Sequence, residues 1–234
     1  MNLYILVEDA KSGKEIVEKW IGLICPKLKR VNTVGELTYN SYIVFSGHGY
    51  PSMLGINPES KPKNILGETI ETINETGIID FFLVFVDGDE AGVTKRIASV
   101  VKKINLYPTG LICPYAVFVQ NKCLETWLLG NTDLLSKNPI DEIVNFLNHY
   151  DIFENDPELM KKDKRYATTD SLYHERYLRE MMKYAGHRYN KAKAAPIMLT
   201  NEYINGLKNR LEKTDHLLSL RTFFEFMDFI NDQT

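Results

Sequence analysis

Short apolar runs alternate with amphipathic stretches through the first half of the chain. The apolar runs, rich in Val, Ile, Leu and Phe, predict strands at residues 3–8, 42–45, 82–86 and 114–119. Apolar residues at helical spacing predict helices at about residues 14–23, 64–76, 91–104 and 123–129. This alternation favours an α/β fold with a central, mainly parallel four-stranded sheet flanked by helices.

The pattern changes after about residue 135, where no further strand is predicted. Helical spacing continues at about residues 139–149, 172–184, 202–213 and 222–230. The last of these helices is too apolar to be surrounded by water, so we expect it to dock against the sheet. We therefore predict a sheet domain over residues 1–135, which would carry the catalysis, and a helical C-terminal subdomain over residues 136–234.

The composition is that of an ordinary globular protein, with 44% hydrophobic and 25% charged residues in a chain of 234. No apolar stretch approaches the ~20 residues of a membrane span, so no membrane association is expected. The three cysteines, Cys25, Cys113 and Cys123, form no C-x-x-C pair. They argue against a disulfide framework and a zinc site, and favour reduced thiols in a cytoplasmic protein.

Positive charge is concentrated in residues 159–193, here called the basic segment, although the net charge of the chain is −3. The segment holds ten Lys or Arg residues against four acids. Because phosphate binding needs only a local patch, the segment predicts contact with a nucleic-acid backbone. The candidate contacts are Lys161, Lys162, Lys164, Arg165, Arg188, Lys191 and Lys193. For any single lysine, a solvated helix end is the alternative.

Two carboxylates follow the third apolar run directly, in Asp87-Gly88-Asp89. Alternation along an extended backbone would point Asp87 and Asp89 the same way, at the carboxyl end of a central strand. Two such carboxylates repel each other and require a cation, and oxygen ligands suit Mg²⁺ or Mn²⁺. The alternative is a structural turn, in which Gly88 and Gly92 serve the backbone. Glu90 is interpreted as an acid that complements the dipole of the following helix.

Two further strand ends carry polar candidates. Glu8 closes the first strand, where it is either a metal ligand and general base or a cap or ion-pair partner for the next helix. The second strand leads into Gly47-His48-Gly49, whose glycines would let backbone N–H groups approach a phosphate. His48 is a candidate base, although a loop histidine is more often incidental.

An apolar strand that ends in Glu8, followed later by Asp87-Gly88-Asp89-Glu90-Ala91-Gly92, resembles the Toprim domain. This domain occurs in bacterial primases, topoisomerases, small RNA maturases and the overcoming-lysogenization-defect (OLD) nucleases. The resemblance covers roughly residues 1–130 and implies a Rossmann-like Toprim fold. It also implies catalytic and metal-binding roles for Glu8, Asp87 and Asp89.

The same resemblance implies roles for two later residues. Glu125 precedes Trp127 and two leucines at a helix start, as a metal-binding Glu does in OLD-type proteins; an ordinary first-turn Glu is the alternative. OLD-type nucleases also place a catalytic lysine late in the chain, which Lys191 or Lys193 would supply. One departure concerns the second acid that these nucleases often carry four residues after the first. Ser12 stands there, so a second metal lacks a ligand unless Asp9 or Glu15 substitutes.

The chain is too short for a strand-passing topoisomerase, shows no primase zinc domain and has no G-x-x-x-x-G-K-[ST] motif. We therefore expect a stand-alone Toprim nuclease that uses Mg²⁺ or Mn²⁺ to cut DNA or RNA. By resemblance it would act in phage defence with a separate ATPase partner, and it could form a homodimer. The alternatives are nucleotidyl or phosphoryl transfer to a smaller substrate, and a non-catalytic regulatory subunit with a degenerate site. A basic segment folded onto the acid-bearing edge would favour a polymer substrate.

Overall fold

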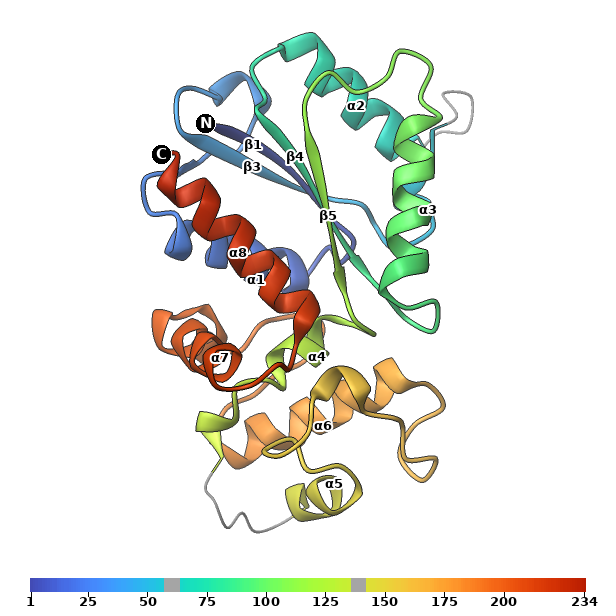
Figure 1. Ribbon diagram of the computed structural model, residues 1–234, viewed down its shortest axis with the longest axis vertical. Helices are drawn as coiled ribbons and strands as arrows, with labels where there is room; N and C mark the ends of the chain where they lie inside the picture. The colour runs from blue at the N-terminus through green and yellow to red at the C-terminus, as the bar shows by residue number, and fades with distance from the viewer. Residues whose placement is uncertain (57–63, 136–141) are drawn as a thin grey trace.

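The computed structural model describes residues 1–56, 64–135 and 142–234, and its centre is a parallel sheet (Figure 1). The strands are β1 (Asn2–Val7), β2 (Lys29–Arg30), β3 (Ser41–Ser46), β4 (Phe81–Asp87) and β5 (Tyr115–Gln120). They lie in the order β2-β3-β1-β4-β5, and every neighbouring pair is parallel. The α/β prediction is confirmed. The predicted strand number is one too low, because two polar residues in β2 carry no apolar period.

Helices cover both faces of the sheet, as the alternation of its buried side chains requires. They are α1 (Ser12–Ile24), α2 (Ile65–Thr76), α3 (Val93–Asn105), α4 (Leu124–Leu128), α5 (Ile143–His149), α6 (Asp170–Tyr184), α7 (Asn201–Lys213) and α8 (Leu218–Asp232). In β1, Tyr4 and Leu6 face a core shared with α2 and α3. Leu3 and Ile5 face the opposite core, shared with α1 and α8.

The last helix docks against the sheet, as its apolar composition predicts. Phe223 of α8 is fully buried, and its ring lies edge-on to Phe85 and Phe118 of the sheet at 5.5 and 5.6 Å between centroids. The same ring stacks on Trp127 of α4 at 5.8 Å. One apolar core therefore continues from the sheet through α4 into α6, α7 and α8.

Helices α4, α5 and α6 lie beyond the carboxyl ends of β4 and β5 and are drawn below the sheet in Figure 1, whereas α8 lies along its face. The predicted helix at 139–149 is observed as α5, and residues 139–141 lie outside the described part of the chain. Within the described residues, no helix combines the length and apolar content that a membrane span requires. The three cysteines are buried free thiols.

Candidate functional site

The carboxyl ends of three neighbouring strands open onto one cavity of about 390 Å³. This is the edge where parallel α/β sheets hold their ligands. Residues from the ends of β1 and β4, from the loop after β3, from α4 and from the basic segment meet there. The lining residues are Glu8, Asp9, Ala10, His48, Gly49, Asp87, Leu124, Glu125 and Lys191. The structure thus brings together most of the acids that the sequence singled out.

Glu8 joins the three strand ends. Its Oε2 accepts the N–H of Asp87 at 2.9 Å, and its Oε1 accepts the N–H of Tyr50 at 3.0 Å. Burial raises the pKa of Glu8, these two amides oppose the rise, and the charge of Asp89 adds to it. Glu8 does not cap the next helix, because Asp9 accepts the N–H groups of Lys11 and Gly13 there.

Asp87 lies half-buried at the end of β4, close to other side chains that carry negative charge. Burial raises the pKa of Asp87 well above its usual range, and the charges of Glu8, Glu125 and Asp89 raise it further; Lys191 opposes them. No described residue donates a hydrogen bond to this carboxylate. Its oxygens therefore remain available to a cation or to a proton.

Asp89 does not stand beside Asp87 in the way that strand alternation predicted. Strand β4 ends at Asp87, and Asp89 has a positive φ of 44°, so the backbone is no longer extended. Its Oδ2 pairs with Arg96 Nη2 at 3.1 Å, and the guanidinium lies over the ring of Tyr50. Asp89 lies outside the cavity lining and influences Glu8 and Asp87 through its charge.

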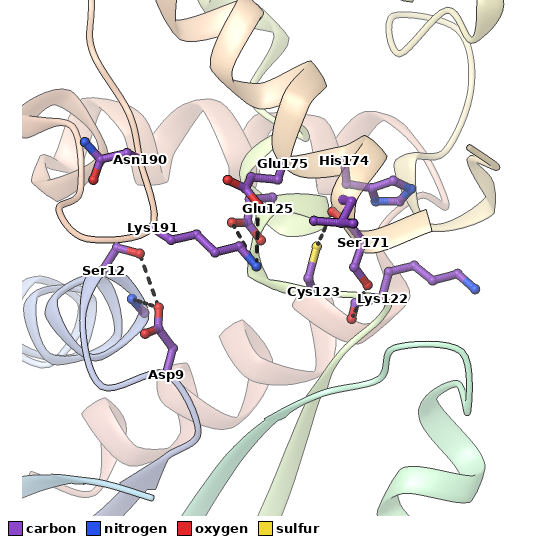
Figure 2. A network of polar contacts seen from close by, with 12 residues as sticks. Asp9, Ser12, Lys122, Cys123, Glu125, Ser171, His174, Glu175, Asn190 and Lys191 are labelled. Carbon is purple, nitrogen blue, oxygen red and sulfur yellow. Dashed lines mark hydrogen bonds and ion pairs between the residues drawn. The ribbon is translucent and has the colours of Figure 1, made fainter. Parts of the chain in front are cut away.

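Glu125 stands in the first turn of α4 and is 3% exposed. The hydroxyl of Tyr189 donates to its Oε1 at 2.8 Å. Lys191 Nζ lies 4.0 Å from the same oxygen and 3.7 Å from Oε2 of Glu175, as Figure 2 shows. Tyr189 and Glu175 were not predicted as site residues, because nothing in their local sequence marks them; Tyr189 lies 64 residues from its partner Glu125.

The loop after β3 offers no free backbone amides to a phosphate. The N–H of Gly47 donates to Val7 O at 2.7 Å, that of His48 to Ser46 Oγ at 3.3 Å, and that of Gly49 to Glu8 O at 3.1 Å. A Cβ at position 47 would lie 2.4 Å from that of Met53, so Gly47 serves packing. The predicted phosphate cradle is therefore replaced by a loop that holds Glu8, with the His48 side chain at the cavity.

The basic segment folds onto the acid-bearing edge but neutralises part of its own charge. Asp170 binds Lys161 and Lys122 at 3.2 and 3.3 Å, and it donates its N–H to Glu90 at 3.4 Å. Glu90 therefore lies in the turn before α3, outside its first turn, and its side chain contacts the start of α6. Arg165 pairs with Asp163, and Lys162 Nζ donates to Thr168 O. Within the described residues, Lys164, Arg188 and Lys193 form no ion pair.

Asp9 and Glu15 are the two acids that could replace the missing second-metal ligand. Both oxygens of Asp9 accept hydrogen bonds at the start of α1, including one from Ser12 Oγ at 3.2 Å. Glu15 Oε2 accepts the N–H of Ala194 at 3.1 Å, and Glu15 lies outside the cavity lining. Neither residue supplies an uncommitted carboxylate for a second ion.

The donor chemistry of the cavity suits one hard cation. Asp87 and Glu125 present carboxylate oxygens, the ligands that Mg²⁺ and Mn²⁺ prefer. As the side chains stand, no three His, Cys, Asp or Glu residues of the described chain surround a common point closely enough to coordinate an ion. Binding therefore requires side-chain rotation, and the charge of the bound cation would offset both the burial and the like charges that raise the pKa of Asp87.

A buried histidine of α6 forms a hydrogen bond with a side chain of α4. His174 is fully buried; its Nε2 lies 3.1 Å from Met160 O, and its Nδ1 lies 2.7 Å from Thr126 Oγ1. These partners suit a neutral ring with the proton on Nε2. Burial lowers the pKa of His174 to about 4.

Because the unfolded chain takes up this proton near pH 6.5, we expect the free energy of unfolding to fall by about 3 kcal/mol between pH 6.5 and pH 4. Urea denaturation at several pH values would measure the slope. The His174→Gln variant should lose the part of this pH dependence that comes from His174. The His187→Gln variant, changed in the loop after α6, should keep it. Equal slopes in both variants would contradict this assignment.

Comparison of the chain with models of protein families, with curated proteins and with solved structures found no match. What is inferred about function therefore depends on the residues and geometry of the cavity.

Proposed function

We propose that the protein is a metal-dependent nuclease of Toprim type, which hydrolyses phosphodiester bonds in DNA or RNA with Mg²⁺ or Mn²⁺. One observation supports this more than any other. Carboxylates from three separate elements, Glu8, Asp87 and Glu125, line one cavity together with Lys191. Acids that carry like charge at a sheet edge, beside a cation, suit phosphoryl chemistry.

Each side chain has a role that its contacts support. Asp87 and Glu125 would hold the metal, which when bound polarises the phosphate and lowers the pKa of a water. Glu8, fixed by two backbone amides, is placed to take the proton of the attacking water. Lys191 faces the cavity and can neutralise charge that develops on the phosphate. Asp89 and Arg96 would keep the neighbouring turn in place.

A polymer substrate is favoured by the basic segment, which closes over the acid-bearing edge. The loop at residues 186–195, here called the strap, includes the end of the basic segment and carries Lys191 into the cavity. It also bears Arg188 and Lys193, which form no ion pair with the described residues. Such residues suit contact with phosphates flanking the scissile one. A separate ATPase partner, assembly as a homodimer and a role in phage defence belong to the same proposal.

The test is cleavage of supercoiled plasmid and of a structured RNA by the purified chain, with Mg²⁺ or Mn²⁺ and with a chelator. We expect cleavage that the chelator stops and that Glu125→Gln reduces by roughly 10²-fold. Glu154→Gln, at an exposed position, is the matched control and should cut as the wild type does.

Cleavage that persists in chelator, or that Glu125→Gln leaves intact, would contradict the proposal. So would the absence of cutting with either metal. In that case phosphoryl transfer to a small substrate becomes the better candidate, because a cavity of about 390 Å³ falls within the range of small-molecule sites.

A further inference from the structure

Lys191 lies between two carboxylates that differ in their relation to the cavity. Glu125 lines the cavity, whereas Glu175, on α6, does not. The Lys191 ammonium is 4.0 Å from the first and 3.7 Å from the second, and Figure 2 shows the side chain reaching across to both. One cation is therefore shared by a carboxylate inside the site and a carboxylate outside it.

The backbone around Lys191 is fixed, so a change of partner involves the side chain alone. Tyr189 is 5% exposed and is anchored by its hydrogen bond to Glu125. Asn190 Oδ1 accepts the N–H groups of Ala192 and Lys193, and the carbonyl of Lys191 accepts the N–H of Ser12. The Lys191 side chain itself is 49% exposed and has a flexible four-carbon stem.

Glu175 can remain the ion-pair partner of Lys191 when Glu125 binds another cation. It is 7% exposed, and its Oε1 is already bound by Arg179 one helical turn away. Its Oε2 is directed to Lys191. A nearly buried carboxylate needs compensating charge, so Glu175 retains an attraction for Lys191 whatever happens in the cavity.

We propose that Lys191 is the counter-cation of the site before metal binds, and that Glu175 is the partner to which its ammonium withdraws when Glu125 takes up a divalent cation. This inference rests on the proposed function, since it assumes that Asp87 and Glu125 hold a metal. It assigns to Glu175 a positioning role that sets metal affinity and keeps Lys191 near the substrate phosphate.

The proposal predicts opposite changes in Mn²⁺ affinity for two substitutions that each replace a charged side chain with an uncharged one. Lys191→Met removes a competing positive charge, so Mn²⁺ should bind roughly tenfold more tightly although cleavage falls. Glu175→Gln leaves the ammonium with Glu125 alone, so Mn²⁺ should bind several-fold more weakly. In the double variant the effect of Glu175→Gln should shrink, because the cation through which it acts is gone.

The experiment is Mn²⁺ binding to the full chain without nucleic acid, followed by electron paramagnetic resonance of the free ion. Lys213→Met, at an exposed position at the end of α7, is the matched control and should bind as the wild type does. Lys191→Gln repeats the main test with a polar side chain, and circular dichroism checks that each variant is folded. Affinity that is unchanged or weaker in both Lys191 variants would overturn the proposal.

Failure of the proposed function gives a different result in the same experiment. If Mn²⁺ binds equally well to Asp87→Asn, the ion does not occupy the cavity, and both proposals fall. If Asp87→Asn abolishes binding but the Lys191 variants do not tighten it, the metal site stands and only the role of Lys191 is overturned. Independent effects of Lys191→Met and Glu175→Gln in the double variant would overturn the role of Glu175.

Discussion

Replacing Asp87 with Asn is expected to reduce cleavage by roughly 10³-fold or more. Asp87 lies at the centre of the acidic cluster, where the charges of Glu8, Glu125 and Asp89 all act on it. An amide keeps the size of the carboxylate but offers a weaker, neutral ligand to a hard cation. The loss should appear in kcat at saturating Mg²⁺, measured on whichever polymer the wild-type protein cuts.

The same substitution should stabilise the metal-free protein near neutral pH. Burial and like charges hold the pKa of Asp87 well above its usual range, so the folded state binds this proton more tightly than the unfolded chain does. The stability of the wild type in chelator should therefore fall as the pH rises from about 4 through the folded pKa. Asp87→Asn, which cannot ionise, should lack this part of the slope and melt at a higher temperature.

The control is Asp215→Asn, at an exposed position far along the chain from the strand ends. This variant should keep both the activity and the wild-type pH dependence. Added Mg²⁺ should raise the melting temperature of the wild type more than that of Asp87→Asn, because a ligand stabilises only the state that binds it. A variant that is inactive but melts below the wild type in chelator would indicate lost structure and not lost ligation.

Parallel topology explains why so much of the site could be predicted from the sequence. The carboxyl ends of parallel strands meet at one edge, so Glu8 and Asp87 were expected to approach each other once the strands were located. The pairing of Val7 with Phe85 in neighbouring strands brings their ends together, and Glu125 follows the next strand. Local pattern was sufficient for residues that directly end a strand.

Other features depend on contacts that no local pattern encodes. Whether the chain stays extended after Asp87 was decided by a positive φ at Asp89, which moves its carboxylate towards Arg96. Tyr189 contacts Glu125, and Glu175 contacts Lys191, through packing of the helical region that follows the sheet in the chain. The amides of the loop after β3 are occupied by acceptors that only the folded chain supplies.

Replacing Phe223 with Ala is expected to lower the free energy of unfolding by about 3–5 kcal/mol. The ring is fully buried and contacts aromatic residues of two strands, of α4 and, through Trp20, of α1. Its removal leaves a cavity that several elements cannot fill together. Phe229→Ala, on the same helix but 48% exposed, is the matched control and should cost much less.

The form of the unfolding curve will show whether the helical region is independent of the sheet. Because Phe223 belongs to a core that runs from the sheet into α6 and α7, we expect a single urea transition that shifts as a whole. Two transitions, with the sheet unaffected, would instead support separate domains divided near residue 135.

Phe223 also stacks on Trp127, two residues after Glu125, so weakening α8 should loosen a proposed metal ligand. Partial loss of Mn²⁺ affinity in folded Phe223→Leu would reveal that coupling.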